Sequence, residues 1–319
     1  MNDPQSQPDI SQILSGVGPD GRVAPPWFQL FVLLVIMFGC LILGGLATYG
    51  MLHFSDSSYE AVTGGEPGTL GTLRWLLFFN QLFAFALPGV LTALYLYRRS
   101  WKQEMDLDRT PAWGLLLLAS VLMLTGMPLA QLLMQWNQAL PLPQWAGTME
   151  DRSNGLIANM LEMNTPLDFV VSLLIMAVLP AIGEELIFRG FLQKNLQRWF
   201  RDRRGHLAVW VGAAIFSAIH FQFQGFLPRM FLGLVMGYLY LWSKNLWVPM
   251  LVHFINNALM VVVSYVASEK ISDTLENLEK TGTESVSAAS SVVFLVPFLG
   301  IGYLIYNRYG RKRDVLSEA

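Results

Sequence analysis

The sequence predicts an all-α protein, a polytopic membrane bundle of about eight transmembrane helices with both termini in the cytoplasm. First, 53% of the 319 residues are hydrophobic and 14% are charged, whereas soluble domains carry roughly 25% charge. Second, the apolar residues form long runs, and most charges lie in short links between them. Third, basic and acidic links alternate along the chain. Together these observations indicate that lipid is the solvent of this protein.

Eight apolar stretches approach the length of about 20 residues that a helix needs to cross a bilayer. Open strands cannot satisfy their backbone groups in lipid, so we expect helices. The fifth and sixth stretches are the shortest. The eight stretches are residues 27–52, 73–97, 112–136, 167–192, 207–223, 228–243, 246–267 and 289–307.

The charges of the links predict the orientation. The links 98–111 and 193–206, Lys244 and the segment after residue 307 carry the bases, whereas the links in between carry acids. Because basic links stay on the cytoplasmic side, eight spans place both termini there. The pattern fits a multi-pass protein of a bacterial inner membrane.

Composition also excludes some classes of function. A net charge of -2 and the lack of a basic face with interleaved aromatic residues argue against nucleic acid as a partner. The single cysteine, Cys40, lies in the first apolar run and cannot form an intrachain disulfide, and no Cys/His zinc spacing is present. The expected partners are the lipid bilayer and a membrane-associated peptide or protein.

Ionisable residues inside the predicted helices indicate a functional site, because each costs at least about 2.5–3.5 kcal/mol to insert. In the string EELIFR, Glu185 and Arg189 are four residues apart, so they share a helix face and can pair. Glu184 points about 100° away from Glu185 and has no partner within its own helix. This carboxylate therefore suits a general base or acid.

Two further predicted helices add His220, and His253 together with Asn257, in otherwise apolar surroundings. His253 and Asn257 are four residues apart and project from one face. A carboxylate, two imidazoles and a carboxamide suffice to activate a water and to stabilise an oxyanion, as peptide hydrolysis requires. A single buried histidine is usually a packing residue, and a Glu–Arg pair is usually structural. The prediction therefore depends on the joint pattern.

Three motifs in this region resemble those of the CPBP family of intramembrane proteases. This family includes the type II CAAX prenyl endopeptidases and the bacteriocin-processing and abortive-infection-like proteins. EELIFR resembles the family's EExxxR motif, FSAIH (216–220) its FxxxH motif and HFINN (253–257) its HxxxN/D motif. All three occur in the family's order, each on a predicted membrane helix. The resemblance covers roughly residues 166–267.

The resemblance implies a role for each motif residue. Glu184 and His220 would activate the water that attacks the scissile carbonyl, and His253 and Asn257 would hold the oxyanion. The residues alone distinguish Glu184 from Glu185, but they do not assign the two histidines.

The resemblance also implies structural support for the site. Glu185 and Arg189 would fix the geometry of their helix, and Phe216 would pack beside the site. On this basis we expect four regions. They are a mobile N-terminal tail (1–25) without the features of a secretory signal, three transmembrane helices (26–165), a CPBP-like catalytic core (166–267), and an outer loop, last helix and basic tail (268–319).

Glu184, His220 and His253 are also a possible His₂Glu metal set with one open position for water. One divalent metal, zinc or similar, is therefore an alternative cofactor. HExxH is absent, so the chain is not a zincin. We favour a metal-independent water activated by glutamate.

The predicted function is an intramembrane endopeptidase that cleaves a membrane-associated peptide or protein from a site nearer the cytoplasmic side. Two alternatives stay open. One is a catalytically silent scaffold or regulator of the same family. The other is a proton-coupled transporter that uses the same carboxylate and histidines as a relay, although the repeated halves typical of transporters are absent.

The predicted helix boundaries raise one conflict. Counted from the cytoplasmic helix ends at about 1.5 Å per residue, Glu184 and His253 would lie roughly 10–12 Å deep. His220 would lie nearer 20 Å deep by the same count. A common site requires these depths to agree.

Overall fold

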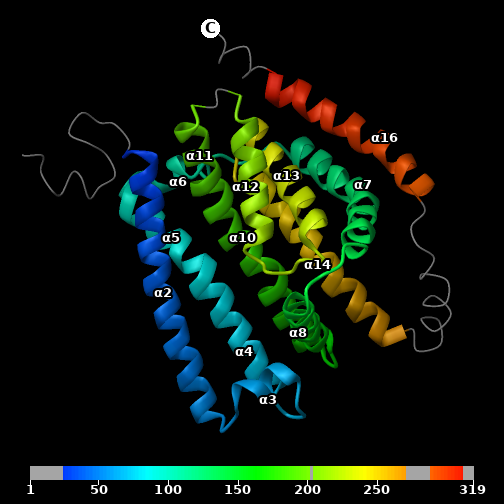
Figure 1. Ribbon diagram of the computed structural model, residues 1–319. Coiled ribbons are helices and arrows are strands. Elements are labelled where there is room, and N and C mark those ends of the chain that lie inside the picture. The colour runs from blue at the N-terminus through cyan, green and yellow to red at the C-terminus, as the bar shows by residue number, and fades with distance from the viewer. Residues whose placement is uncertain (1–23, 202–203, 271–287, 312–319) are drawn as a thin grey trace, which may run out of the picture.

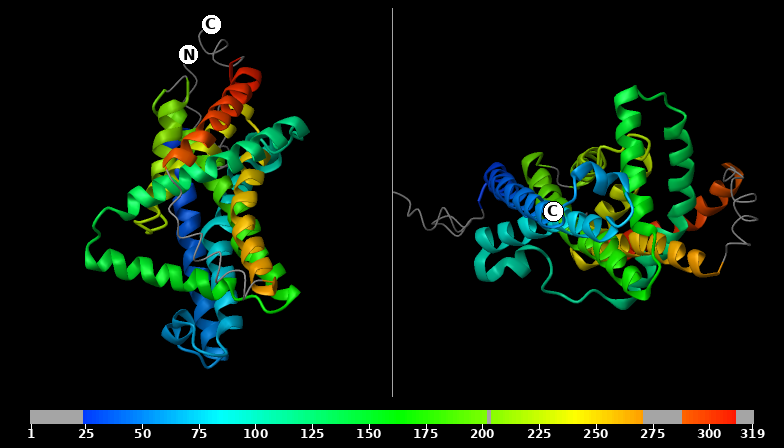
Figure 2. Two further views of the ribbon diagram at one scale, coloured as in Figure 1. Left: turned by 90° about the vertical axis from the view of Figure 1, so that its right-hand side faces the viewer. Right: turned by 90° about the horizontal axis from the view of Figure 1, so that it is seen from below.

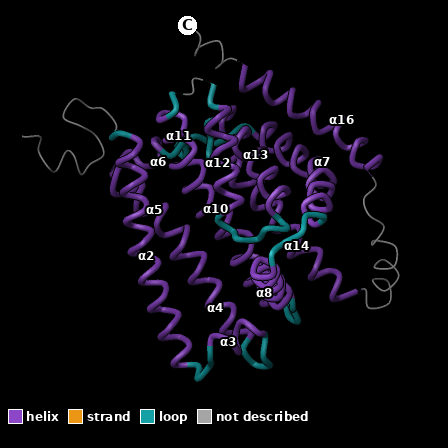
Figure 3. Tube along the Cα trace, viewed as in Figure 1, coloured by secondary structure: helices purple, strands orange, loops and turns teal. Residues whose placement is uncertain are grey.

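The computed structural model describes residues 24–201, 204–270 and 288–311, and all regular structure within these ranges is helical (Figure 3). The predicted all-α fold class is confirmed. Most of the predicted N-terminal tail, most of the predicted outer loop and the end of the basic tail lie outside the described residues.

In the described residues, eight α-helices precede α10, and the last of them, α9, forms the first part of the central rod of the bundle. These are α2 (Pro26–Phe54), α3 (Tyr59–Gly64), α4 (Leu70–Gln81), α5 (Leu87–Tyr97), α6 (Trp101–Glu104), α7 (Trp113–Gln138), α8 (Gln144–Leu161) and α9 (Pro166–Leu173). The later helices are α10 (Leu179–Glu185), α11 (Lys194–Trp199), α12 (His206–Ala218), α13 (Phe226–Ser243), α14 (Trp247–Lys270) and α16 (Ala288–Ile305).

Several of these helices join end to end through π-helical turns. The turn η1 (Leu82–Ala86) links α4 to α5, and η3 (Leu174–Val178) and η4 (Leu186–Gln193) link α9, α10 and α11 into one rod. Single π-turns inside α-helices are frequent at functional sites. In this chain η4 begins directly after the two adjacent glutamates.

Within the described ranges, five helices are long and apolar enough to cross a membrane. They are Pro26–Phe54, Leu70–Glu104, Trp113–Gln138, Pro166–Trp199 and Trp247–Val266. All eight predicted stretches contain a helix, but α12 has only 13 residues and α13 has 18. The predicted count of eight spans and the placement of the termini therefore stay predictions.

The helices pack around the central rod α9–α11 (Figure 1). On one side α2 lies against α4 and α5, and on the other α12, α13 and α14 separate the rod from α7 and α16. The short helix α6 and the α11–α12 link gather at one end of the bundle, and α3 lies at the opposite end. Helix α8, which lies in the acidic link between the third and fourth predicted spans, runs crosswise to α2 and α14 (Figure 2).

Polar contacts fasten the α6 end of the bundle. Lys194 of α11 and Asp106 form an ion pair of 2.8 Å, and the Tyr240 hydroxyl of α13 donates to the Asp106 carboxylate at 2.6 Å. The Leu246 backbone N–H, just before α14, donates to the Asp106 carbonyl at 3.0 Å. The link that contains Asp106 therefore aligns α11, α13 and α14. Of these, α14 carries a site motif and α11 continues from one.

Gly183, which precedes Glu184, permits the closest helix crossing near the site. An added Cβ there would lie 2.6 Å from the backbone nitrogen of Ala86 in η1. Backbone atoms cannot move aside as a flexible side chain can. The glycine therefore places Glu184 deep between the central rod and η1.

Gly183→Ala is expected to destabilise the protein by about 1–3 kcal/mol, because the added methyl group forces the two helices apart. The matched control is Gly45→Ala in α2, where an added Cβ meets nothing within 4 Å. The control should be neutral or gain about 0.5–1 kcal/mol from the lower entropy of the unfolded chain. Unfolding midpoints in detergent measure both effects, and equal midpoints for the two variants would contradict the close crossing.

Candidate active site

The central rod supplies a buried acidic and basic cluster. Glu184, Glu185 and Arg189 are 4%, 0% and 2% exposed. Arg189 Nη1 donates to Glu185 Oε1 at 2.8 Å, and Nη2 donates to the Gly233 carbonyl at 3.0 Å. The guanidinium carbon lies 4.8 Å from the centre of the Phe216 ring. The predicted Glu185–Arg189 pair is confirmed, and it fastens the rod to α12 and α13.

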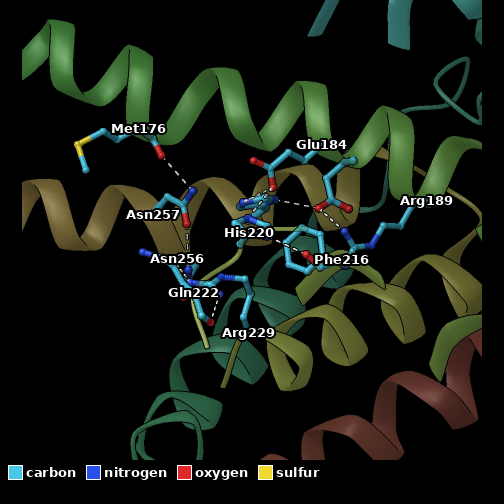
Figure 4. Close-up of polar contacts among 11 residues, drawn as sticks. Met176, Glu184, Arg189, Phe216, His220, Gln222, Arg229, Asn256 and Asn257 are labelled. Carbon is cyan, nitrogen blue, oxygen red and sulfur yellow. Dashed lines mark hydrogen bonds and ion pairs between the residues drawn. The ribbon is translucent and has the colours of Figure 1, made fainter. Parts of the chain in front are cut away.

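Helix α14 places His253 beside both glutamates, and Figure 4 shows Glu184 above His220 in the same cluster. His253 Nδ1 lies 2.8 Å from Glu185 Oε1, and Nε2 lies 4.0 Å from Glu184 Oε2. Because an ionised carboxylate can only accept a hydrogen bond, Nδ1 carries the proton of this contact. Glu185 therefore orients the ring so that Nε2 faces Glu184.

His220 reaches the same point from the turn that follows α12. Its Nδ1 donates to the Phe216 carbonyl at 2.7 Å, since a carbonyl oxygen only accepts. Its Nε2 lies 3.8 Å from Glu184 Oε2. The Phe216 ring packs edge-on against both imidazoles, with centroids 5.0 Å from His220 and 6.1 Å from His253.

The conflict in depth between Glu184 and His220 disappears because the central rod is longer than we expected. The rod continues to Trp199 instead of ending near residue 192, and α12 begins at His206. At 1.5 Å per residue, Glu184 and His220 both lie about 20 Å from the link between α11 and α12.

The three side chains therefore share one point. Glu184 Oε2 is buried and receives no hydrogen bond from the protein, and both imidazole Nε2 atoms face it. Separations of 3.8 and 4.0 Å suit a single water that contacts all three atoms, because each contact would be about 2.8 Å long.

The comparisons with known proteins agree with this geometry. Residues 166–259 match the family model described as type II CAAX prenyl endopeptidase Rce1-like. The match shows that this segment is similar to the Rce1-like family. It contains all three motifs, so the resemblance read from the sequence is confirmed.

A curated relative and the solved structures add less. The chain is 30% identical over 121 residues to the uncharacterized protein YpbD of Bacillus subtilis (strain 168), a match that covers 36% of this chain and 58% of that protein. The chain therefore spans little more than half of this relative. No solved structure matches. With its long apolar helices and its Rce1-like segment, the chain is an integral membrane protein.

The separations between Glu184 and the two histidines are wider than those between the ligands of a bound zinc, and metal dependence stays a prediction. Two ligands of a tetrahedral zinc, each about 2.1 Å from the metal, lie roughly 3.4 Å apart. The separations from Glu184 to the two histidines are 3.8 and 4.0 Å. In the described part of the chain, no group of three His, Cys, Asp or Glu side chains is placed to hold a metal ion.

Asn257 lines the cavity that also contains Glu184, His220 and His253, but it has protein partners. Its Nδ2 donates to the Met176 carbonyl in η3 at 3.0 Å, and its Oδ1 accepts from Asn256 Nδ2 at 3.0 Å. One amide hydrogen of Asn257 is therefore used by the backbone, and the other is available to a ligand. Its oxyanion role stays a prediction.

A cavity of 630 Å³ opens from the Rce1-like site. Its walls come from α4, α8, α10, α14 and the α12–α13 link, with Leu156 and Met160 on α8 among the apolar lining residues. Helix α8 lies toward the α3 end of the bundle, away from the basic links (Figures 1 and 2). The cavity therefore extends toward the end that the charge pattern assigns to the outside. Our expectation of a site opening nearer the cytoplasmic side was drawn from depth counted along single helices, and it stays a prediction.

Sequence reasoning also missed polar residues of the cavity. Arg229 of α13 donates to the Gln222 side chain and to the Gln222 carbonyl, and both residues line the cavity. Asn80 and Gln81 line it from α4. Arg229 carried a usable signal, because it lies inside the predicted span 228–243, where an ionisable residue indicates function. The neutral amides carried no such signal.

Proposed function

We propose that this protein is an intramembrane endopeptidase that hydrolyses a peptide bond of a membrane-associated peptide or protein. The nucleophile is a water activated by Glu184 without a metal. The observation that carries the proposal is the convergence of Glu184 Oε2 with the Nε2 atoms of His220 and His253, at 3.8 and 4.0 Å. The match of residues 166–259 to an endopeptidase family model supports it.

The residues divide the chemistry between them. Glu184 takes a proton from the water, and the oxygen attacks the scissile carbonyl carbon while His220 Nε2 helps to hold that water. The carbonyl oxygen becomes an oxyanion. The C–N bond then breaks, and the proton held by Glu184 passes to the departing amine nitrogen.

His253 serves the oxyanion in this proposal. The Glu185 carboxylate at Nδ1, 2.8 Å away, stabilises positive charge on the imidazole ring, so that a protonated Nε2 can donate to the oxyanion. Asn257 adds its free amide hydrogen. Arg189 balances the charge of Glu185 and keeps it oriented, without touching the substrate.

The cavity supports a peptide as the substrate. Apolar side chains, among them those of α8, η3 and α13, line most of it, and carboxamides such as Asn80 and Asn256 can bond the polar groups of a peptide backbone. The cavity lies between membrane helices, so a membrane-associated substrate reaches it without crossing water. The charge pattern of the links supports a bacterial inner membrane as the location.

The test is hydrolysis in H₂¹⁸O. Purified protein in detergent is incubated with a library of lipid-tethered peptides, and fragments are read by mass spectrometry. We expect one ¹⁸O atom in each new C-terminal carboxylate, because the attacking oxygen comes from water. A chelator, followed by added zinc, should change the rate less than about twofold, since no step needs a metal.

Two results would oppose the proposal. Loss of cleavage in chelator with recovery in zinc would indicate that a metal bound by Glu184, His220 and His253 activates the water. Absence of any ¹⁸O-labelled fragment across the library, from protein with a cooperative unfolding transition, would favour a silent scaffold of the same family.

A further inference from the structure

An apolar groove runs between α13 and α16 on the outside of the bundle. Helix α16 packs against α7 and lies at the edge of the bundle (Figure 1), and the groove has a volume of 340 Å³. Phe231 contacts Phe298 with ring centroids 5.5 Å apart, and Trp242 contacts Tyr306 at 5.7 Å. These two ring contacts bound the groove at its two ends, and Leu122 of α7 lines it between them.

The hollow of the groove is opened by a glycine. A Cβ added to Gly302 of α16 would meet Leu122 Cδ1 at 3.8 Å and nothing closer. The Tyr238 hydroxyl, a polar group on the α13 wall, already accepts a hydrogen bond from Trp210 Nε1 at 3.1 Å. Because the rest of the lining is mainly aliphatic and aromatic carbon, the groove suits an apolar occupant.

The dimensions of the groove fit one extended hydrocarbon chain. From Phe231 to Trp242 it follows α13 for about 16 Å, which is close to the hydrocarbon thickness of one leaflet, about 15 Å. Its volume divided by this length gives a mean cross-section of about 21 Å². A helix with its side chains is about 10–12 Å wide and needs several times that area. A helix of a second copy of this chain therefore does not fit.

Aromatic and basic residues lie at one end of the groove. Trp242 is the last but one residue of α13, and Tyr306 begins the π-turn η5 (Tyr306–Gly310). Tryptophan and tyrosine favour the depth of the membrane–water interface. Arg308 and Arg311 follow within five residues and are exposed. The charge pattern assigns this end to the cytoplasm, where basic pockets between membrane helices bind anionic head groups.

Helix α13 separates the groove from the catalytic cavity. Leu232 and Met236 line the cavity, whereas Leu234 and Tyr238 line the groove. Residues two apart on a helix point about 200° away from each other. The lipid anchor of a peptide bound at the catalytic site would therefore lie on the other side of α13, and the lipid of the bilayer itself is the source of the hydrocarbon chain.

We infer that the groove binds an anionic phospholipid of the cytoplasmic leaflet. One acyl chain lies along α13 between the two ring contacts, and the phosphate contacts the guanidinium groups of Arg308 and Arg311. This inference does not depend on the proposed function, because the described residues that line the groove and those that line the catalytic cavity have no member in common.

Photolabelling in detergent tests this inference. The purified full chain is mixed with phosphatidylglycerol that carries a diazirine in one acyl chain, illuminated and digested, and the labelled peptides are mapped by mass spectrometry. We expect labelling of segments 231–242 and 298–306 to saturate. Unlabelled phosphatidylglycerol should compete about 10- to 30-fold better than phosphatidylcholine, the effect of two basic side chains beside an anionic head group.

Three variants separate the acyl chain from the head group. Gly302→Leu fills the groove and should abolish the labelling that unlabelled lipid can displace. The matched control is Gly300→Leu, which makes the same change where an added Cβ meets nothing within 4 Å, and it should be labelled like the wild type. Arg308→Gln/Arg311→Gln should remove the preference for phosphatidylglycerol and leave the groove open to the acyl chain.

The results decide between a bound lipid and the ordinary lipid layer around the protein. Labelling that is unchanged in Gly302→Leu, or that no unlabelled lipid displaces, would indicate only that surrounding layer and overturn the inference. Equal competition by the two lipids would overturn the anionic head group. If the unfolding midpoint shows that Gly302→Leu is misfolded, competition in the wild type and in Arg308→Gln/Arg311→Gln decides the question.

Discussion

Glu184→Gln is expected to lower kcat for peptide cleavage by about 10²- to 10⁴-fold, the contribution typical of a general base. Glutamine keeps the size and one oxygen of the side chain but cannot take a proton from water. The fold should survive, because Glu184 Oε2 receives no hydrogen bond from the protein. Single-turnover cleavage of a lipidated peptide, with the unfolding midpoint measured in parallel, gives both quantities.

The control for this variant is Glu60→Gln, which makes the same chemical change on the exposed helix α3. It should cleave at the rate of the wild type. Equal rates for all three proteins would remove Glu184 from the mechanism. A large loss in Glu184→Gln together with a lowered midpoint would indicate a structural role instead.

Much of the site could be predicted because helical spacing is a local property. Residues four apart share a face, so the sequence predicts the Glu185–Arg189 pair and turns Glu184 to another side. The structure confirms the pair at 2.8 Å. The convergence of His220 and His253 on Glu184 is not local. The joint pattern of ionisable residues in apolar helices predicted it, and only the roles of the two histidines came from the resemblance to a known family.

The features of the fold and the site that the sequence did not predict depend on how the helices pack. Asn257 keeps the spacing that we expected from His253, yet a carbonyl in the π-turn η3 takes one of its amide hydrogens. Hydropathy could not fix the number of spans, because a 13-residue helix such as α12 can be covered by its neighbours. The polar composition of residues 144–161 resembles that of a link, so the sequence did not predict α8 or the cavity wall that it forms.

Arg189→Met is expected to destabilise the protein by about 3–5 kcal/mol, as removal of one partner of a buried ion pair does. Glu185 is fully buried, and without Arg189 its charge would keep only the hydrogen bond with His253. The Gly233 carbonyl would also lose the donor that joins α13 to the rod. Unfolding midpoints in detergent should therefore fall well below those of the wild type and of Glu184→Gln.

The double variant Glu185→Gln/Arg189→Met distinguishes the effect of an unpaired Glu185 charge from the effect of losing the Arg189 contacts. With no unpaired charge left, it should regain more than half of the lost stability, because neutral replacement of a buried pair costs little. Its activity should stay low, since a glutamine at 185 can orient His253 through Nδ1 but cannot stabilise an imidazolium. A double variant as unstable as Arg189→Met would show that the bond to Gly233, and not the charge of Glu185, is what Arg189 contributes. Recovery of both stability and activity would remove the Glu185 carboxylate from the mechanism and leave Glu184 with His220 to act alone.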